Sequence, residues 1–222
     1  MTTVKAKTRC RLVVEGHDDR MSVKGLMKWH TKWPDAPEDA PVWIELGKSV
    51  SEILKPSFLT SFLKASDYDV LGVMLDADDS SPGNRYKNIR ASCLGEFPDL
   101  PENLDASGIV SQNKFGKRFG VWIMPDNVAE GCLETFLKLL IPAEKANLWK
   151  HACESSAGAK ALGADWCAND ETKAQLYTWL AWQETPGQSP GTALTKKMLD
   201  PKSDSTKSFV GWFINLYSLP AL

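Results

Sequence analysis

The sequence predicts an α/β fold in which a mostly parallel, Rossmann-like sheet is flanked by helices and followed by a helical C-terminal extension. Short apolar runs alternate with segments whose apolar residues recur at helical spacing, which is the pattern of a parallel sheet. The run 68–75 (YDVLGVML) is rich in Val and Leu, as expected of a strand that is buried on both faces. We therefore expect one domain over residues 1–140 and a helical extension over 141–222 that packs on it.

Each expected element follows from its local pattern. Strands are predicted over residues 9–15, 42–46, 68–75, 109–110 and 119–124. Helices are predicted over residues 18–30, 50–63, 85–97, 128–140, 143–154, 171–182 and 205–219. Pro56 interrupts the second helix as a kink or a break. The basic segment 112–118 indicates a hairpin turn, and the Gly- and Pro-rich segment 185–191 indicates a loop.

Composition excludes several classes of protein. No stretch approaches the roughly 18 apolar residues of a membrane helix, and the first 14 residues lack the apolar centre of a signal peptide, so we expect a cytoplasmic protein without membrane contact. The five cysteines are scattered and form no CxxC or Cys/His cluster, which argues against zinc and against a disulfide framework. The net charge of −2 requires any nucleic-acid surface to be local.

Acidic residues gather where three predicted strands end. Glu15 closes the first strand, and Asp76 and Asp78 follow the central strand. Asp126, Glu130 and Glu134 follow the last strand. Ligands of open α/β sheets bind beyond the carboxyl ends of the strands, which is where these acids lie.

Clustered carboxylates repel one another, and a divalent cation is the simplest compensation. Dense oxygen ligands suit Mg²⁺, so we expect Glu15, Asp76 and Asp78 to share a metal site. Glu130 and Glu134 would lie on one helix face with Asp126 leading into it, which makes a second metal position possible. Ordinary roles as turn and cap residues remain open for the other acids, namely Asp18, Asp79, Asp126 and Glu130.

The segments LVVEGHDD and VMLDADD resemble the Toprim domain of topoisomerases, primases and OLD-family nucleases, over roughly residues 9–140. Asp19 and the segment Gly131-Cys132-Leu133-Glu134 look more like OLD-type and small bacterial Toprim-like nucleases than like a topoisomerase. The resemblance implies acid/base work for Glu15 and metal binding by Asp76 and Asp78. It further implies that Asp19 and Glu134 hold a second ion.

By this resemblance the chain is a hydrolase, a Toprim endonuclease that uses Mg²⁺ or Mn²⁺, as one ion or two, to cleave phosphodiester bonds of DNA or RNA. Two ions would stabilise the attacking water and the leaving oxygen, so no Tyr or Ser nucleophile is needed. Phage defence or nucleic-acid processing is the expected setting. OLD nucleases usually carry an ATPase, but this chain has no P-loop. A separate ATPase or regulatory protein is therefore an expected partner. The sequence leaves open whether the protein forms an oligomer.

Competing interpretations rest on the same acids. A receiver domain would place a Lys directly before Pro125, where this chain has Met124. A dehalogenase-type phosphatase would carry its DxD motif after the first strand, whereas Asp76 and Asp78 follow a later one. A non-catalytic Toprim-like module that binds a protein or nucleic acid would tolerate dispersed acids, or acids paired with Arg85 or Lys87.

Basic residues are the remaining candidates for contacts with the substrate. Arg85 and Lys87 are candidate phosphate contacts, and so are the hairpin residues Lys114, Lys117 and Arg118. His17, beside Glu15, could assist proton transfer.

Overall fold

The computed structural model describes residues 7–65 and 67–222; residues 1–6, part of the segment examined for a signal peptide, lie outside the described residues. Its centre is a five-stranded sheet in the order β2-β1-β3-β5-β4. The strands are β1 (Cys10–Val14), β2 (Trp43–Leu46), β3 (Val70–Asp76), β4 (Ile109–Gln112) and β5 (Arg118–Met124). All neighbours pair in parallel except β4, which is antiparallel to β5. The predicted α/β fold class is confirmed.

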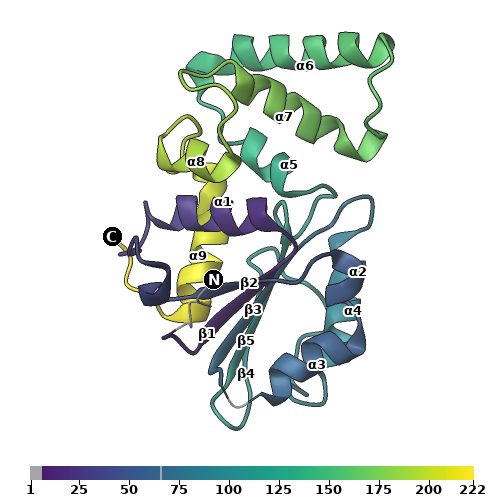
Figure 1. Ribbon diagram of the computed structural model, residues 1–222. Helices are drawn as coiled ribbons and strands as arrows, with labels where there is room; N and C mark the ends of the chain where they lie inside the picture. The colour runs from purple at the N-terminus through teal and green to yellow at the C-terminus, as the bar shows by residue number, and fades with distance from the viewer. Residues whose placement is uncertain (1–6, 66) are drawn as a thin grey trace, which may run out of the picture.

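Helices cover both faces of this sheet (Figure 1). The α-helices are α1 (His17–Met27), α2 (Val50–Ile53), α3 (Pro56–Lys64), α4 (Pro82–Cys93), α5 (Leu133–Lys138), α6 (Ala146–Ala161), α7 (Glu171–Ala181), α8 (Pro190–Thr195) and α9 (Lys207–Tyr217). Short 3-10 helices lie at Pro37–Asp39, Ala143–Lys145, Ala168–Asp170 and Asp204–Thr206. None of the helices in the described ranges has the length and apolar character needed to cross a membrane.

Two predicted helices differ from the structure. The helix expected over 50–63 is divided, because Pro56 cannot donate an interior hydrogen bond and instead occupies the first turn of α3. The helix expected over 128–140 begins only at Leu133. Before it, the carboxylate of Asp126 accepts from the backbone N–H groups of Val128 and Ala129, and Asn127 has a φ of 66°. These local side-chain bonds replace the first turns of a helix.

The sheet separates two apolar clusters. Residues of β3 alternate between them, with Val70 and Met74 facing α1, α8 and α9, and Leu71 and Val73 facing α3 and α4. Gly72 breaks the alternation of large side chains. A Cβ atom there would stand 2.3 Å from the Tyr217 hydroxyl, so the glycine lets α9 lie close against the sheet.

The C-terminal helices have two roles. Helix α8 begins near the end of the predicted 185–191 loop and packs on α1. Helix α9 packs on β3, β4 and β5. Helices α6 and α7 pack against each other beyond the carboxyl edge of the sheet (Figure 1). The chain after residue 140 therefore both covers the sheet and projects over the edge where parallel strands end.

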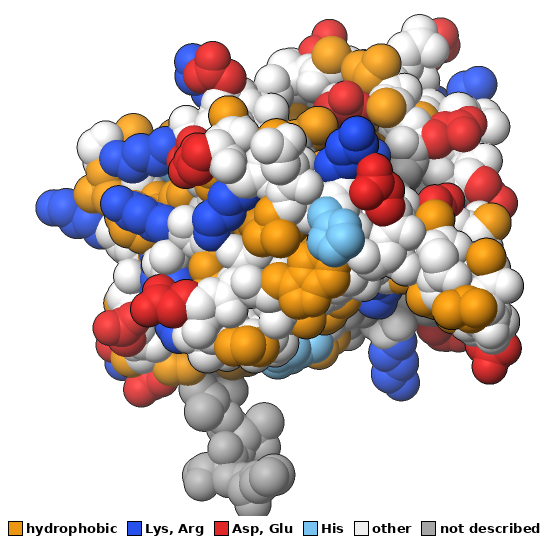
Figure 2. Space-filling view, turned by 90° about the horizontal axis from the view of Figure 1, so that it is seen from above, with side chains coloured by type: hydrophobic (Ala, Val, Ile, Leu, Met, Phe, Trp, Pro, Cys, Tyr) orange, Lys and Arg blue, Asp and Glu red, His pale blue; other side chains and the backbone are white. Residues whose placement is uncertain are grey.

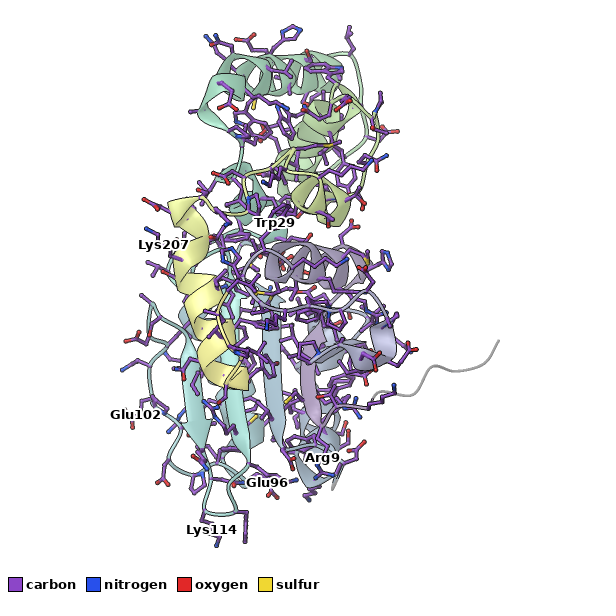
Figure 3. The ribbon with its side chains drawn as sticks, turned by 90° about the vertical axis from the view of Figure 1, so that its left-hand side faces the viewer. Arg9, Trp29, Glu96, Glu102, Lys114 and Lys207 are labelled. Carbon is purple, nitrogen blue, oxygen red and sulfur yellow. The ribbon has the colours of Figure 1, made fainter. Side chains whose placement is uncertain are left out.

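The predicted hairpin is present, but its basic tip lies at the opposite edge. Arg118 is in register with Val70, the first residue of β3, and Lys114 lies at the end of the molecule remote from α6 and α7 (Figure 3). Arg118 donates to the Asn215 carbonyl, and Lys117 lies over the Tyr68 ring. These hairpin residues therefore cannot contact a phosphate bound at the carboxyl edge.

Candidate functional site

The acids of β1 and β3 flank the topological switch point of the sheet. Helix α1 leaves β1 on one face, whereas α4 leaves β3 on the other face (Figure 1). The connections diverge between these adjacent strands, which opens a crevice at their carboxyl ends. Glu15 follows β1 and Asp76 ends β3, so the sheet itself brings these two carboxylates together.

Backbone N–H groups hold the carboxylates in place. Glu15 Oε1 accepts from the N–H of Asp76 at 2.9 Å, and Asp76 Oδ1 accepts from the N–H of Leu133 at 2.9 Å. Asp19 Oδ2 accepts from the N–H of Gly16, also at 2.9 Å. These bonds link β1, β3, α1 and the start of α5, and they orient the acids without neutralising their charge.

A cavity of about 310 Å³ lies at this point. Its lining consists of Glu15, Gly16, His17, Asp18, Asp19, Lys48, Asp76, Leu133, Glu134 and Lys173. We call it the acidic cavity. Asp19 and Glu134 are buried, and Glu15 and Asp76 are half-buried. Seen from the side of α6 and α7, the molecule shows scattered acidic side chains, with Lys and Arg gathered at one side, so no broad acidic surface marks the site on this face (Figure 2).

Burial makes the ionised carboxylates unfavourable. It raises the pKa of Glu15 to about 7 and the pKa of Asp19 to about 6, and neighbouring carboxylates add to both shifts. The pKa of Asp76 lies well above its usual range, because of burial and of the charges on Asp19, Glu15 and Glu134. Within the described ranges, Glu15, Asp19 and Asp76 form no ion pair with a basic side chain. When these three carboxylates ionise, their negative charge is therefore not balanced by an ion pair within the described ranges.

Two lysines line the acidic cavity without having been predicted there. Lys173 of α7 lies 3.9 Å from Glu134, measured from Nζ to Oε1. Lys48 follows the end of β2 with a φ of 78°, and its place just after a strand was a usable signal in the sequence. No local signal identifies Lys173, because α7 reaches the cavity only through the fold. The hydroxyl of Tyr177, one turn along α7, donates to Asp18 Oδ2 at 2.6 Å.

Asp78 stands beside the acidic cavity and does not line it. Its Oδ2 accepts from Arg85 at 3.0 Å, and Arg85 also donates to the Ala77 carbonyl. The charge of Asp78 nevertheless raises the pKa of Glu15 and of Asp76. The structure therefore brings Glu15, Asp19, Asp76 and Glu134 together and leaves Asp78 paired at the margin.

Asp126, Glu130 and Lys87, like Asp78 and Arg85, are not part of the lining of the acidic cavity. Asp126 and Glu130 are exposed in the loop before α5, so Glu130 and Glu134 do not share a helix face as the predicted helix required. The carboxylate of Asp126 is used in its own turn. Lys87 is exposed on α4 and is not part of the lining. The helix face on which the second metal position was predicted is therefore absent, and Asp126 and Glu130 lie apart from the acidic cavity.

The donor set fits a divalent cation in its chemistry. Carboxylate oxygens are the preferred ligands of Mg²⁺, and a cation would balance the buried charge of Glu15, Asp19 and Asp76. As the side chains lie, no three His, Cys, Asp or Glu residues in the described ranges form a group that could hold a metal ion. Joint coordination therefore requires these carboxylates to turn toward a common point.

A family model described as "Protein of unknown function (DUF3226)" matches residues 9–218. The match spans both the sheet and the C-terminal helices, so the chain belongs to this family. No curated protein and no solved structure matches the chain.

Proposed function

For this member of the DUF3226 family, we propose a nuclease activity that depends on Mg²⁺ or Mn²⁺ and hydrolyses phosphodiester bonds of DNA or RNA. The observation that carries the proposal is the acidic cavity at the switch point. There Glu15, Asp19 and Asp76 are held by backbone N–H groups and have no basic partner in the described ranges. Such a cluster is costly to maintain without a cation, and a perturbed cluster in a cleft is typical of a functional site.

The lysines in the same lining favour a phosphate substrate. Lys48 and Lys173 place positive charge at a cavity that is otherwise acidic. A phosphodiester bound in this cavity would pair its anionic oxygens with these ammonium groups. The mixture of hard oxygen ligands and cations is the one that phosphoryl-transfer sites use.

The residues of the acidic cavity have different roles in the proposed reaction. Asp76, Asp19 and Glu134 supply the oxygens that would hold the cation, which would stabilise charge on the phosphoryl oxygens when bound. Glu15 keeps Oε2 available for a proton, because its hydrogen bond to the N–H of Asp76 uses Oε1. Lys48 and Lys173 orient the phosphate. Tyr177 fixes α7 to α1 through Asp18, and so positions Lys173.

Cleavage assays with purified full-length protein test this proposal. Plasmid, single-stranded DNA and tRNA are incubated with Mg²⁺ or Mn²⁺, and wild type is compared with Asp76→Asn and Asp19→Asn. We expect cutting that requires the metal and disappears in both variants. Asp126→Asn and Asp79→Asn are matched controls, because both residues are exposed and neither lines the acidic cavity. Cutting that survives in Asp76→Asn, or that the controls also lose, would rule out this site.

The ion pair between Asp78 and Arg85 favours a second candidate function, a non-catalytic module that binds nucleic acid or a protein. The pair neutralises one of the acids that the resemblance assigns to the metal. Arg85→Gln separates the two functions. A nuclease that uses Asp78 should keep or gain metal affinity when the competing guanidinium is removed, whereas a binding module should show no metal-dependent change, as measured by Mn²⁺ titration calorimetry.

A further inference from the structure

A second cavity adjoins the acidic cavity. It has a volume of about 190 Å³ and lies between α1, the connection that follows α1, and β2. His17 lines both cavities, so the two are neighbours across the first turn of α1. We call this second space the α1–β2 cavity. Sites for drug-sized ligands measure about 300–1,000 Å³, so this one suits a single ring system.

One wall of the α1–β2 cavity carries basic side chains. His17, Arg20 and Lys24 recur at spacings of three and four residues, which places them on one face of α1. The side chain of Arg20 makes no hydrogen bond or ion pair with any residue in the described ranges, and its buried Nε has no acceptor. Lys24 has no ion pair there either, and burial together with Lys28 and Arg20 lowers its pKa.

Two acids of the connection already have basic partners. Asp35 accepts from Lys28 at 2.6 Å, and Asp39 accepts from Lys7 at 2.7 Å. Asp35 acts on Lys24 only through its charge, and neither Arg20 nor Lys24 forms an ion pair in the described ranges, so both can pair with an anion from outside the chain. This is the reverse of the acidic cavity, where negative charge lacks a partner.

The opposite walls are apolar and aromatic. Trp33 and Trp43 line them, together with Pro37, Val42 and Ile44. Trp33 is buried at 8% exposure and packs against Phe213, with ring centroids 6.1 Å apart. Trp43 is half-buried at the start of β2. Aromatic faces beside cations bind the bases and phosphates of unpaired nucleic-acid strands.

We propose that the α1–β2 cavity receives one unstacked base of a single-stranded nucleic acid, whose phosphates follow Arg20, Lys24 and His17 to the acidic cavity. This proposal rests on the proposed function, since it names the substrate as an unpaired strand. The helical rise places Lys24 about 10 Å from His17 along α1, the axial length of about three stacked nucleotides. A duplex would keep its bases stacked and out of this space.

Binding without catalysis tests the proposal. Fluorescence anisotropy in EDTA measures the affinity of the full-length protein for a labelled oligothymidylate, for the same backbone with abasic sites, and for a duplex of equal length. Stacking of one base contributes about 1–3 kcal/mol, so the oligothymidylate should bind about 5- to 150-fold more tightly than the abasic strand. Equal affinity for the two strands, preference for the duplex, or no binding at all would overturn the proposal.

Variants assign the affinity to the cavity. Trp43→Leu should remove the difference between the oligothymidylate and the abasic strand. Arg20→Gln and Lys24→Gln should weaken both strands, and each should reduce the slope of log affinity against log salt by about 0.7. Lys32→Gln, at an exposed lysine outside the cavity lining, and Trp182→Leu, exposed on the far helical pair, are the matched controls. Wild-type affinities in the first three variants would overturn the proposal.

The two proposals fail separately. If wild type discriminates between the strands but cuts nothing with Mg²⁺ or Mn²⁺, the base subsite stands and hydrolysis fails. If wild type cuts but the cavity variants bind as wild type does, hydrolysis stands and the subsite fails. Circular dichroism confirms that each variant is folded. Should Arg20→Gln unfold because its guanidinium is half-buried, Lys24→Gln and Trp43→Leu still decide the question.

Discussion

The two edges of the sheet differ in whether their charged side chains are paired and exposed to solvent. At the amino edge, Arg9 pairs with Asp69 at 2.8 Å and Arg11 with Asp67 at 3.5 Å, and both aspartates are exposed to solvent. At the carboxyl edge, Glu15, Asp19 and Asp76 are packed together and have no basic partner in the described ranges. Solvated, paired charges add little to stability, whereas crowded, buried ones lower it. This contrast is the reason why we place the proposed activity at the carboxyl edge.

Removing the charge of Glu15 should have the largest effect. Glu15→Gln keeps an oxygen for the N–H of Asp76 but can no longer exchange a proton. We expect kcat/KM for cleavage to fall by about 10²- to 10⁴-fold, the usual contribution of a general acid or base. The metal-free variant should melt at a higher temperature than wild type, because a buried charge is gone. Glu130→Gln, which changes an exposed acid, should alter neither kcat/KM nor the melting temperature. Unaltered activity in Glu15→Gln would contradict the proposed functional role of the carboxyl edge.

Metal binding should be visible in the melting temperature and should depend on pH. The folded-state pKa values of Glu15 and Asp19, about 7 and about 6, lie above their ordinary values. The folded protein therefore binds more protons than the unfolded chain between about pH 4 and pH 7, and metal-free stability is lost as the pH rises through this window.

Mg²⁺ needs deprotonated ligands, so it should raise the melting temperature by several degrees at about pH 8 and by much less at about pH 5. Differential scanning calorimetry with and without EDTA measures both conditions. The Asp76→Asn variant should show a smaller increase at the higher pH. An equal increase at both values of pH would place the ion elsewhere in the molecule.

Loosening α7 should have an intermediate effect. Tyr177→Phe removes a hydrogen bond to the carboxylate of Asp18, at a cost of about 1.5–3 kcal/mol in the free energy of unfolding. Cleavage should fall several-fold, because Lys173 lies on the same face of α7 one turn away. Tyr86→Phe is the matched control, since its hydroxyl donates to the Pro101 carbonyl away from the acidic cavity. That variant should lose stability in urea titration but keep its activity.

The smallest effect is expected at the amino edge. Asp69→Asn breaks the exposed ion pair with Arg9 and should leave both the melting temperature and the cleavage rate unchanged within error. The test uses the same thermal and cleavage assays as the other variants. A substantial loss in either assay would show that the amino edge also contributes to stability or to activity, which would contradict the difference drawn here between the two edges.

The sequence by itself determined the α/β class, the strand positions and the acids at the strand ends. Apolar runs and their spacing encode these features locally, and parallel strands necessarily bring Glu15 and Asp76 to one edge. It also indicated Asp19 and Glu134, through a resemblance to Toprim nucleases that remains a prediction.

Only the tertiary structure decided the remainder of the site. Lys173 and Tyr177 reach the acids from α7, more than 90 residues after Asp76 in the chain, and no local pattern specifies that approach. The pairing of Asp78 with Arg85 and the late start of α5 depend on side-chain bonds that compete with helix formation and metal binding. The partners of a charge depend on packing, and packing joins residues that the sequence keeps far apart.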